Sequence, residues 1–216
     1  MELKRLVQIC DKIRTDFDAK DAAREKGLAL SREVIRNSAN AIRGVHRGEF
    51  AEARKLLATT SRMLAQASKA LKGHPDIYYA GFLRDAQKEY AEARITLALV
   101  HREQIPDPDE LKVDYSAYLL GLSEAVGELR RHLLDQMRVQ EPTWGEELLT
   151  AMDDIYYLLV SFDYPSAISG NLKRATDVTR SIIEKTRGDL TNALRQERLE
   201  QAMRRLEERI GAGEGE

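Results

Sequence analysis

Apolar residues recur every three or four positions along most of the chain, which is the spacing of one face of an α-helix. Between Asp114 and Leu133 this stripe consists of Tyr115, Leu119, Leu122, Val126, Leu129 and Leu133. Alternating runs rich in Val, Ile and Thr, which would predict strands, are nearly absent. The pattern therefore predicts an all-α protein.

Glycine and proline divide the apolar pattern into seven predicted helices. We expect Gly44 to cap the first helix in a left-handed conformation, Thr143 to cap the fifth, and Gly188 to separate the sixth from the seventh. Nothing in the chain resembles a linker between domains. The sequence predicts one helical domain over residues 1–210 and a disordered tail, GAGEGE, over residues 211–216. The seven helices are predicted at about 2–43, 49–72, 76–101, 114–139, 144–159, 167–186 and 189–210.

The first predicted helix is long for a chain of 216 residues. Residues 2 to about 43 contain no proline and only one glycine, and at 1.5 Å per residue they span roughly 60 Å. A compact domain of this size does not need a helix of that length. We therefore expect part of it to pack on a partner, most simply a second copy of the chain.

Two of the predicted helices carry acidic residues on one face. Glu124 and Glu128 are one turn apart, and Asp85, Glu89 and Glu92 follow the spacing i, i+4, i+7. If these helices pack side by side, four glutamates meet in an oxygen-only cluster, which suits Mg²⁺ or Mn²⁺. The spacing does not require a metal, because the chain has 36 acidic residues and such pairs also occur on solvated faces. Asp85 is expected to be a solvated acid.

Charge and cysteine content indicate the cellular compartment in which the protein is expected. The net charge is −2, but residues 1–47 hold eleven Lys/Arg against seven Asp/Glu. Cys10 is the only cysteine, so no disulfide forms within the chain, and we expect it in the core of a protein in a reducing compartment. No run of 18 apolar residues and no signal peptide are present. The predicted location is the cytoplasm, without a membrane partner.

A basic first helix allows a nucleic-acid partner, since Lys and Arg bind backbone phosphates. For each side chain a solvated face is an equally good interpretation. The candidates for phosphate binding are Lys12, Arg14, Lys20, Arg24 and Arg32.

Several motifs carry a resemblance to a known family, among them GVHRG at 44–48, Tyr78–Tyr79, KEYAEA at 88–93 and YLLGLSEAVGELR at 118–130. They resemble motifs of the translin and translin-associated factor X (TRAX) family. GVHRG at 44–48 resembles the GVHQG turn after the first translin helix, and Tyr78–Tyr79 resembles the paired tyrosines of the third. KEYAEA at 88–93 is similar to the TRAX motif QEYxEA. YLLGLSEAVGELR at 118–130 resembles DYLLGVADLTGELMR, and Arg187–Gly188 resembles the RG break before the last helix. The resemblance covers nearly the whole chain in the expected order.

This resemblance implies a seven-helix subunit that assembles into a closed, hollow barrel whose interior binds RNA. TRAX-type subunits hold Mg²⁺ on acidic residues from two helices and cut RNA, whereas translin-type subunits bind nucleic acid without the acidic set. The acidic positions carry over to Glu89, Glu92, Glu124 and Glu128, with glutamate at 124 in place of aspartate. The basic RFHEHWR stretch of translin is not preserved, because AGFLRDA at 80–86 contains only Arg84.

The prediction is accordingly a metal-dependent endoribonuclease, closer to TRAX in its acidic motif. It would hydrolyse single-stranded RNA with Mg²⁺, or with Mn²⁺, inside an octamer-like homo-oligomeric barrel. Two alternatives stay open at this point. One is an inactive, translin-like oligomer that binds single-stranded RNA or DNA, and the other is a structural helical bundle that assembles partners.

Overall fold

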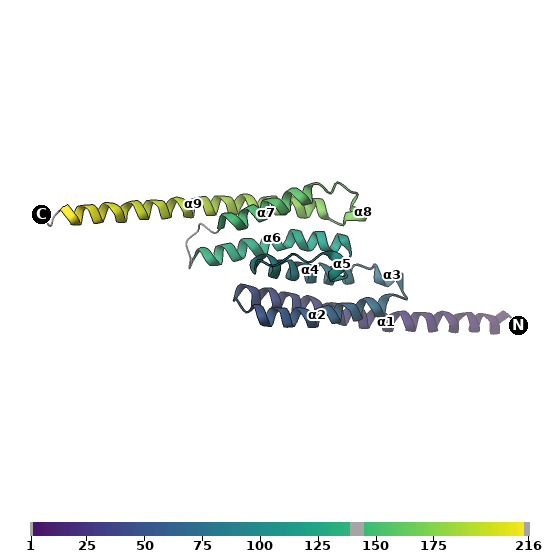
Figure 1. Ribbon diagram of the computed structural model, residues 1–216. Coiled ribbons are helices and arrows are strands. Elements are labelled where there is room, and N and C mark those ends of the chain that lie inside the picture. Colours follow the sequence, from purple (N-terminus) through teal and green to yellow (C-terminus); the bar gives the residue numbers. More distant parts are fainter. Residues whose placement is uncertain (1, 139–144, 214–216) are drawn as a thin grey trace. The chain divides into compact units, whose positions relative to one another are not determined.

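The computed structural model describes residues 2–138 and 145–213, and within them every regular element is a helix, as predicted. Among these residues no strand occurs, and no helix is both long enough and apolar enough to cross a membrane. The chain forms two compact units, Met1–Ala125 and Val126–Glu216. The helices of Figure 1 are α1 (Glu2–His46), α2 (Phe50–Leu71), α3 (Pro75–Tyr78), α4 (Phe82–Val100), α5 (Pro108–Leu111), α6 (Tyr115–Met137), α7 (Gly145–Val160), α8 (Ser166–Ser169) and α9 (Leu172–Gly213).

In the first unit α1 packs against α2 and α4. The buried residues of α2 alternate at spacings of four and three, which gives one continuous stripe toward the core. The turn between α1 and α2 differs from the prediction: α1 continues through Gly44 to His46, and Gly48 takes the positive φ, +76°. Gly44 is therefore an ordinary helical position, where an added Cβ would make normal contact with the Ala53 Cβ at 3.6 Å. The stripe of α2 is Ala53, Leu57, Thr60, Leu64, Ala67 and Leu71.

In the second unit α7 packs against α9, and each helix carries a fully buried leucine, Leu159 on α7 and Leu190 on α9. The predicted break at Gly188 is wrong, because α9 is continuous from Leu172 to Gly213. A glycine inside a helix costs only about 1 kcal/mol relative to alanine. Leu190 is 1% exposed, and Arg187 forms an ion pair of 2.6 Å with Asp153, so contacts on both sides of Gly188 hold the helix together.

The predicted sixth and seventh helices are therefore one helix, and the long helices of the described residues number six rather than seven. The helix α9 also runs past position 210, where the tail was predicted to begin. Residues 214–216 and the predicted cap Thr143 lie outside the described residues.

The first part of α1 lies outside the core of its unit. Every side chain described between Leu3 and Ala19 is exposed, and Figure 1 shows this part of α1 extending past α2. Cys10 lies here and is exposed, so its predicted place in the core was wrong. The second half of α9 has the same character, with exposed Leu199, Met203, Leu206 and Ile210. Both segments thus present apolar side chains that their own unit does not cover.

Candidate metal centre

Within the first unit, α4 and the first part of α6 meet at Gly121. A Cβ added there would lie 2.7 Å from the Lys88 carbonyl oxygen and 2.9 Å from the Glu92 backbone nitrogen. These distances are shorter than any side chain tolerates, so only glycine permits this approach of two helix backbones. The contact fixes the register of α4 against α6 beside the predicted acidic positions.

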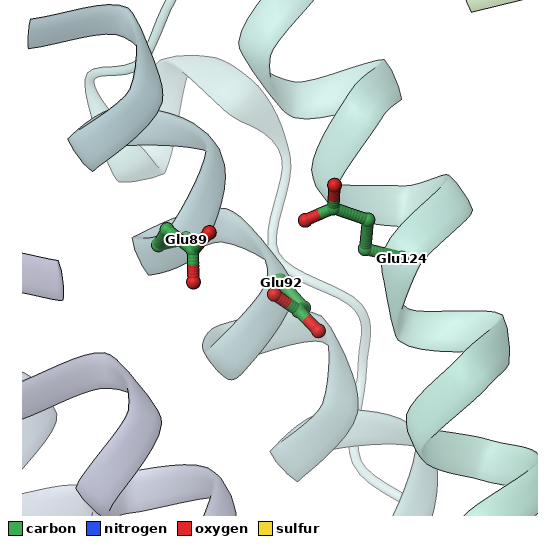
Figure 2. A group of neighbouring side chains, drawn as sticks. All are labelled: Glu89, Glu92 and Glu124. Carbon is green, nitrogen blue, oxygen red and sulfur yellow. The ribbon is translucent and has the colours of Figure 1, made fainter. Parts of the chain in front are cut away.

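Three of the four predicted glutamates come together next to this contact. Glu89 and Glu92 extend from α4, and Glu124 reaches toward them from α6 (Figure 2). Each offers a carboxylate oxygen, and these oxygens all lie within 4.8 Å of one another. Glu92 is 8% exposed, Glu89 is half-buried and Glu124 is exposed, so the cluster opens to solvent on the Glu124 side. Carboxylates this close to one another repel unless a cation lies near them.

The structure supplies such a cation from the chain itself. The Lys88 Nζ donates hydrogen bonds to both carboxylate oxygens of Glu124, at 2.7 and 2.6 Å, and lies 3.1 Å from Glu89 Oε1. Burial by itself lowers the pKa of Lys88, but the hydrogen bonds and charges of Glu124 and Glu89 outweigh it, so the pKa is raised above the ordinary lysine value. Lys88 therefore carries its positive charge at neutral pH.

The composition of the cluster fits a divalent metal. Its three possible ligands are all carboxylates, which are the oxygen donors that Mg²⁺ and Mn²⁺ prefer. Three carboxylates and one ammonium group leave two negative charges. A divalent cation would neutralise this remainder.

The other acidic candidates lie outside this group. Glu128 is one turn further along α6, belongs to the second unit, and lies 3.9 Å from the guanidinium group of Arg131. Its membership of a metal site stays a prediction. Asp85 is exposed in the first turn of α4, as expected for a solvated acid.

The five basic candidates all lie on α1, and three of them form ion pairs with acids of the first unit. Arg14 pairs with Asp11 at 2.7 Å, Lys20 with Asp76 at 3.2 Å, and Arg24 with Glu25 at 2.6 Å. Lys12 and Arg32 are exposed. Exposed pairs of this kind contribute little to stability, so an RNA phosphate can replace their carboxylates at small cost. Their role in binding stays a prediction.

The paired tyrosines line a surface pocket that motif spacing did not indicate. The rings of Tyr78 and Tyr79 meet edge to face with centroids 4.9 Å apart. They share a cavity of about 640 Å³ with Lys69 and Lys72 from the end of α2. An exposed aromatic ring such as that of Tyr79, beside lysines, suits bases and phosphates of single-stranded nucleic acid. The sequence contained one indication of this pocket, the two lysines Lys69 and Lys72 one turn apart before Pro75. Their spacing alone does not predict a binding site, because it does not show that Tyr78 and Tyr79 line the same cavity.

Stability measurements can test the contact between α4 and α6. Gly121→Ala is expected to lower the free energy of unfolding by about 2 kcal/mol, because backbone atoms must move apart to admit the methyl group. Gly188→Ala is the matched control, since nothing lies within 4 Å of its added Cβ and alanine favours helix by about 1 kcal/mol. Urea unfolding at one protein concentration measures both. Equal behaviour of the two variants would show that the close approach at Gly121 is wrong.

Comparisons with known proteins give relatives over most of the chain. An uncharacterized protein of Methanocaldococcus jannaschii, MJ0175, is 31% identical over 189 residues, which are 87% of this chain and 84% of that protein. No model of a protein family matches the sequence.

Solved structures are also similar. The structure of AfC3PO in complex with duplex RNA superposes with a TM-score of 0.77 at 30% identity, covering 85% of this chain and 95% of that one. AfC3PO alone gives a TM-score of 0.78, also at 30% identity, with 85% and 96% of the two chains covered. Apo-NeC3PO gives 0.78 at 19% identity, with the same coverage, and supports the fold.

Proposed function

Because the chain belongs to the translin family, which includes the C3PO proteins, we propose that it is an RNA-binding oligomer that cuts RNA at the cluster of Glu89, Glu92 and Glu124. The observation that carries the proposal is the meeting of three carboxylates from two helices beside Gly121. The complex of AfC3PO with duplex RNA supports the RNA partner. The acidic set supports a TRAX-like subunit, which would hydrolyse phosphodiester bonds.

The residues of the cluster divide the work. Glu89, Glu92 and Glu124 would hold Mg²⁺, or Mn²⁺, with Glu128 as the proposed fourth member. A divalent cation at such a site neutralises charge on the phosphate and lowers the pKa of a bound water. Buried Glu92 has less freedom to turn away from the cluster than an exposed side chain, so it would fix the geometry. Glu124 lies on the solvent-exposed side, from which RNA would arrive.

RNA would be held by basic and aromatic groups of the first unit. Lys12 and Arg32 on α1, together with Lys69 and Lys72 beside Tyr79, are proposed to bind backbone phosphates and stack a base. Such contacts do not read base edges, so binding should be weakly dependent on sequence and strongly dependent on salt. Single-stranded RNA is the proposed substrate and single-stranded DNA a second ligand.

We also propose that copies of the chain associate into a closed, octamer-like barrel. The exposed apolar side chains of α1, and separately those of α9, support association, because apolar side chains that recur along one exposed helix are suited to pack on a partner. Closed rings bury such surfaces completely and leave no free end. An RNA-cutting site inside a barrel would act only on chains that enter it.

One observation favours a second function, an inactive RNA- or DNA-binding oligomer. The ammonium group of Lys88 already lies on Glu124 and Glu89, so ion pairs within the protein satisfy part of the cluster. In that case the cluster would stabilise the packing of α4 on α6 and hold no metal. Activity measurements separate the two functions directly.

The test is cleavage of a labelled single-stranded RNA by the purified oligomer. We expect internal cuts with Mg²⁺ or Mn²⁺, none in EDTA, and recovery when the metal is added back. A duplex of the same sequence belongs in the experiment because the AfC3PO complex contains duplex RNA. Fluorescence anisotropy measures binding separately. RNA binding without cleavage in either metal would establish the inactive function instead.

A further inference from the structure

Lys88 is the one group of the described cluster that a metal site does not need. Its ammonium group contacts two of the three carboxylates, and its side chain is 19% exposed. Its backbone is held in place, because the Lys88 carbonyl oxygen lies where α4 touches Gly121. The side chain therefore starts from a fixed point and has a short path to Glu124 across the helix contact.

We propose that Lys88 is an internal counter-ion of the acidic cluster, which stabilises the three carboxylates in the metal-free protein and lowers their affinity for a divalent cation. This inference rests on the proposed metal site. It makes Lys88 a positioning residue, since it acts through Glu124 and Glu89 and need not contact the RNA.

The two effects have one physical origin. Without a positive charge, three carboxylates within 4.8 Å of one another would repel, and Lys88 relieves this repulsion when no metal is present. A divalent cation that approaches Glu124 must either displace the ammonium group or bind beside it. Displacement breaks two hydrogen bonds of 2.6 and 2.7 Å, and binding beside it places like charges close together. Both routes weaken metal binding.

The position of Lys88 also explains why the metal-free cluster can stay assembled. A site of three carboxylates with no internal cation would be expected to splay apart between encounters with metal. With Lys88 present, Glu124 keeps its orientation toward α4, as Figure 2 shows for its side chain. The protein gives up metal affinity and gains a cluster that is ready to bind.

The experiment compares Lys88→Met with the unchanged protein, both free of RNA. Methionine keeps the length of the side chain and removes the charge. Titration calorimetry with Mn²⁺ should show a dissociation constant lowered about fivefold, the effect of roughly 1 kcal/mol for an ion pair at the edge of the surface. Thermal unfolding in EDTA should occur a few degrees lower in Lys88→Met, and saturating Mn²⁺ should raise its unfolding temperature more than that of the unchanged protein.

Three further variants make the result specific. Lys88→Arg retains the charge and should restore weak Mn²⁺ binding to within about twofold of the unchanged protein. Lys55→Met removes a charge from an exposed position of α2 and should leave Mn²⁺ affinity unchanged. Lys88→Gln provides the same comparison in a side chain that can still donate hydrogen bonds to Glu124, should Lys88→Met fail to fold.

The outcomes separate this inference from the proposed function. If the unchanged protein binds Mn²⁺ and Lys88→Met binds it equally or more weakly, the counter-ion role is overturned while the metal site stands. If neither binds Mn²⁺, the metal site and the inference both fall. If Lys88→Met binds tighter but Lys88→Arg and Lys55→Met do so as well, the effect is not a charge effect at this site, and the inference is again overturned.

Discussion

Replacing Glu92 with glutamine is expected to reduce Mg²⁺-dependent RNA cleavage by at least about a hundredfold, because a metal-ion site supplies several kcal/mol of transition-state stabilisation. Glu92 is the most buried carboxylate of the cluster, so its position is the most restricted of the three. Glutamine keeps the volume and removes one negative charge. Single-turnover cleavage of a labelled RNA measures the rate, and anisotropy should show RNA binding equal to or tighter than that of the unchanged protein.

Asp85→Asn is the matched control for this experiment. Asp85 lies on the same helix, one turn before Glu89, and is exposed, so its loss removes the same charge without touching the cluster. It should leave the cleavage rate within about twofold of the original, as solvated surface charges generally do. Full activity in Glu92→Gln would show that the three carboxylates are not the site.

Glu128→Gln then decides whether the fourth carboxylate belongs to the metal site. If Glu128 is a metal ligand, the variant should lose RNA cleavage. Its stability without metal should be unchanged or higher, because the repulsion between Glu124 and Glu128, one turn apart on α6, is removed. If Glu128 has a structural role instead, for example in its ion pair with Arg131, the variant should be slightly less stable and fully active. Thermal unfolding and cleavage on one preparation distinguish the two roles.

The class of fold followed from the sequence because helical periodicity is a local signal that each segment repeats several times. The buried stripe of α2 is such a case, since its spacing of four and three is visible without any knowledge of α1. The errors arose where tertiary contacts outweigh local preference. The sequence around Gly188 predicts a break in the helix. The structure keeps α9 helical there, because Leu190 is buried and Arg187 forms an ion pair with Asp153.

Part of the candidate site could also be predicted from the sequence, because the spacing of acids along one helix is a local signal. Spacing on each helix placed acids on one face, and the structure brings Glu89 and Glu92 to Glu124 across Gly121. Lys88 was missed although it stands where the resembling motif has glutamine. A lysine next to Glu89 in sequence points to a neighbouring face of the helix, and its flexible chain reaches Glu124, 36 residues away, only once α6 is in place.

The second large expected effect is on self-association, and it comes from the exposed part of α1. Leu3, Leu6, Cys10, Ile13 and Phe17 alternate at spacings of three and four, which is the seam of a helix that packs on another helix. Leu6 is 54% exposed and Ile13 is 48% exposed, so their own unit gains little from them. Mutating these side chains should therefore weaken assembly while the subunit keeps its fold.

The double variant Leu6→Glu/Ile13→Glu is expected to weaken association by about a thousandfold, because two buried aliphatic side chains contribute about 4 kcal/mol together. Light scattering coupled to size-exclusion chromatography should report smaller species at micromolar concentration, while far-UV circular dichroism stays helical. Gln8→Glu introduces a charge on the opposite face of the same exposed segment and should leave the assembly intact. If the double variant keeps the size of the unchanged protein, the apolar seam of α1 is not the interface, and the exposed stripe of α9 at Leu199, Met203, Leu206 and Ile210 becomes the surface to change.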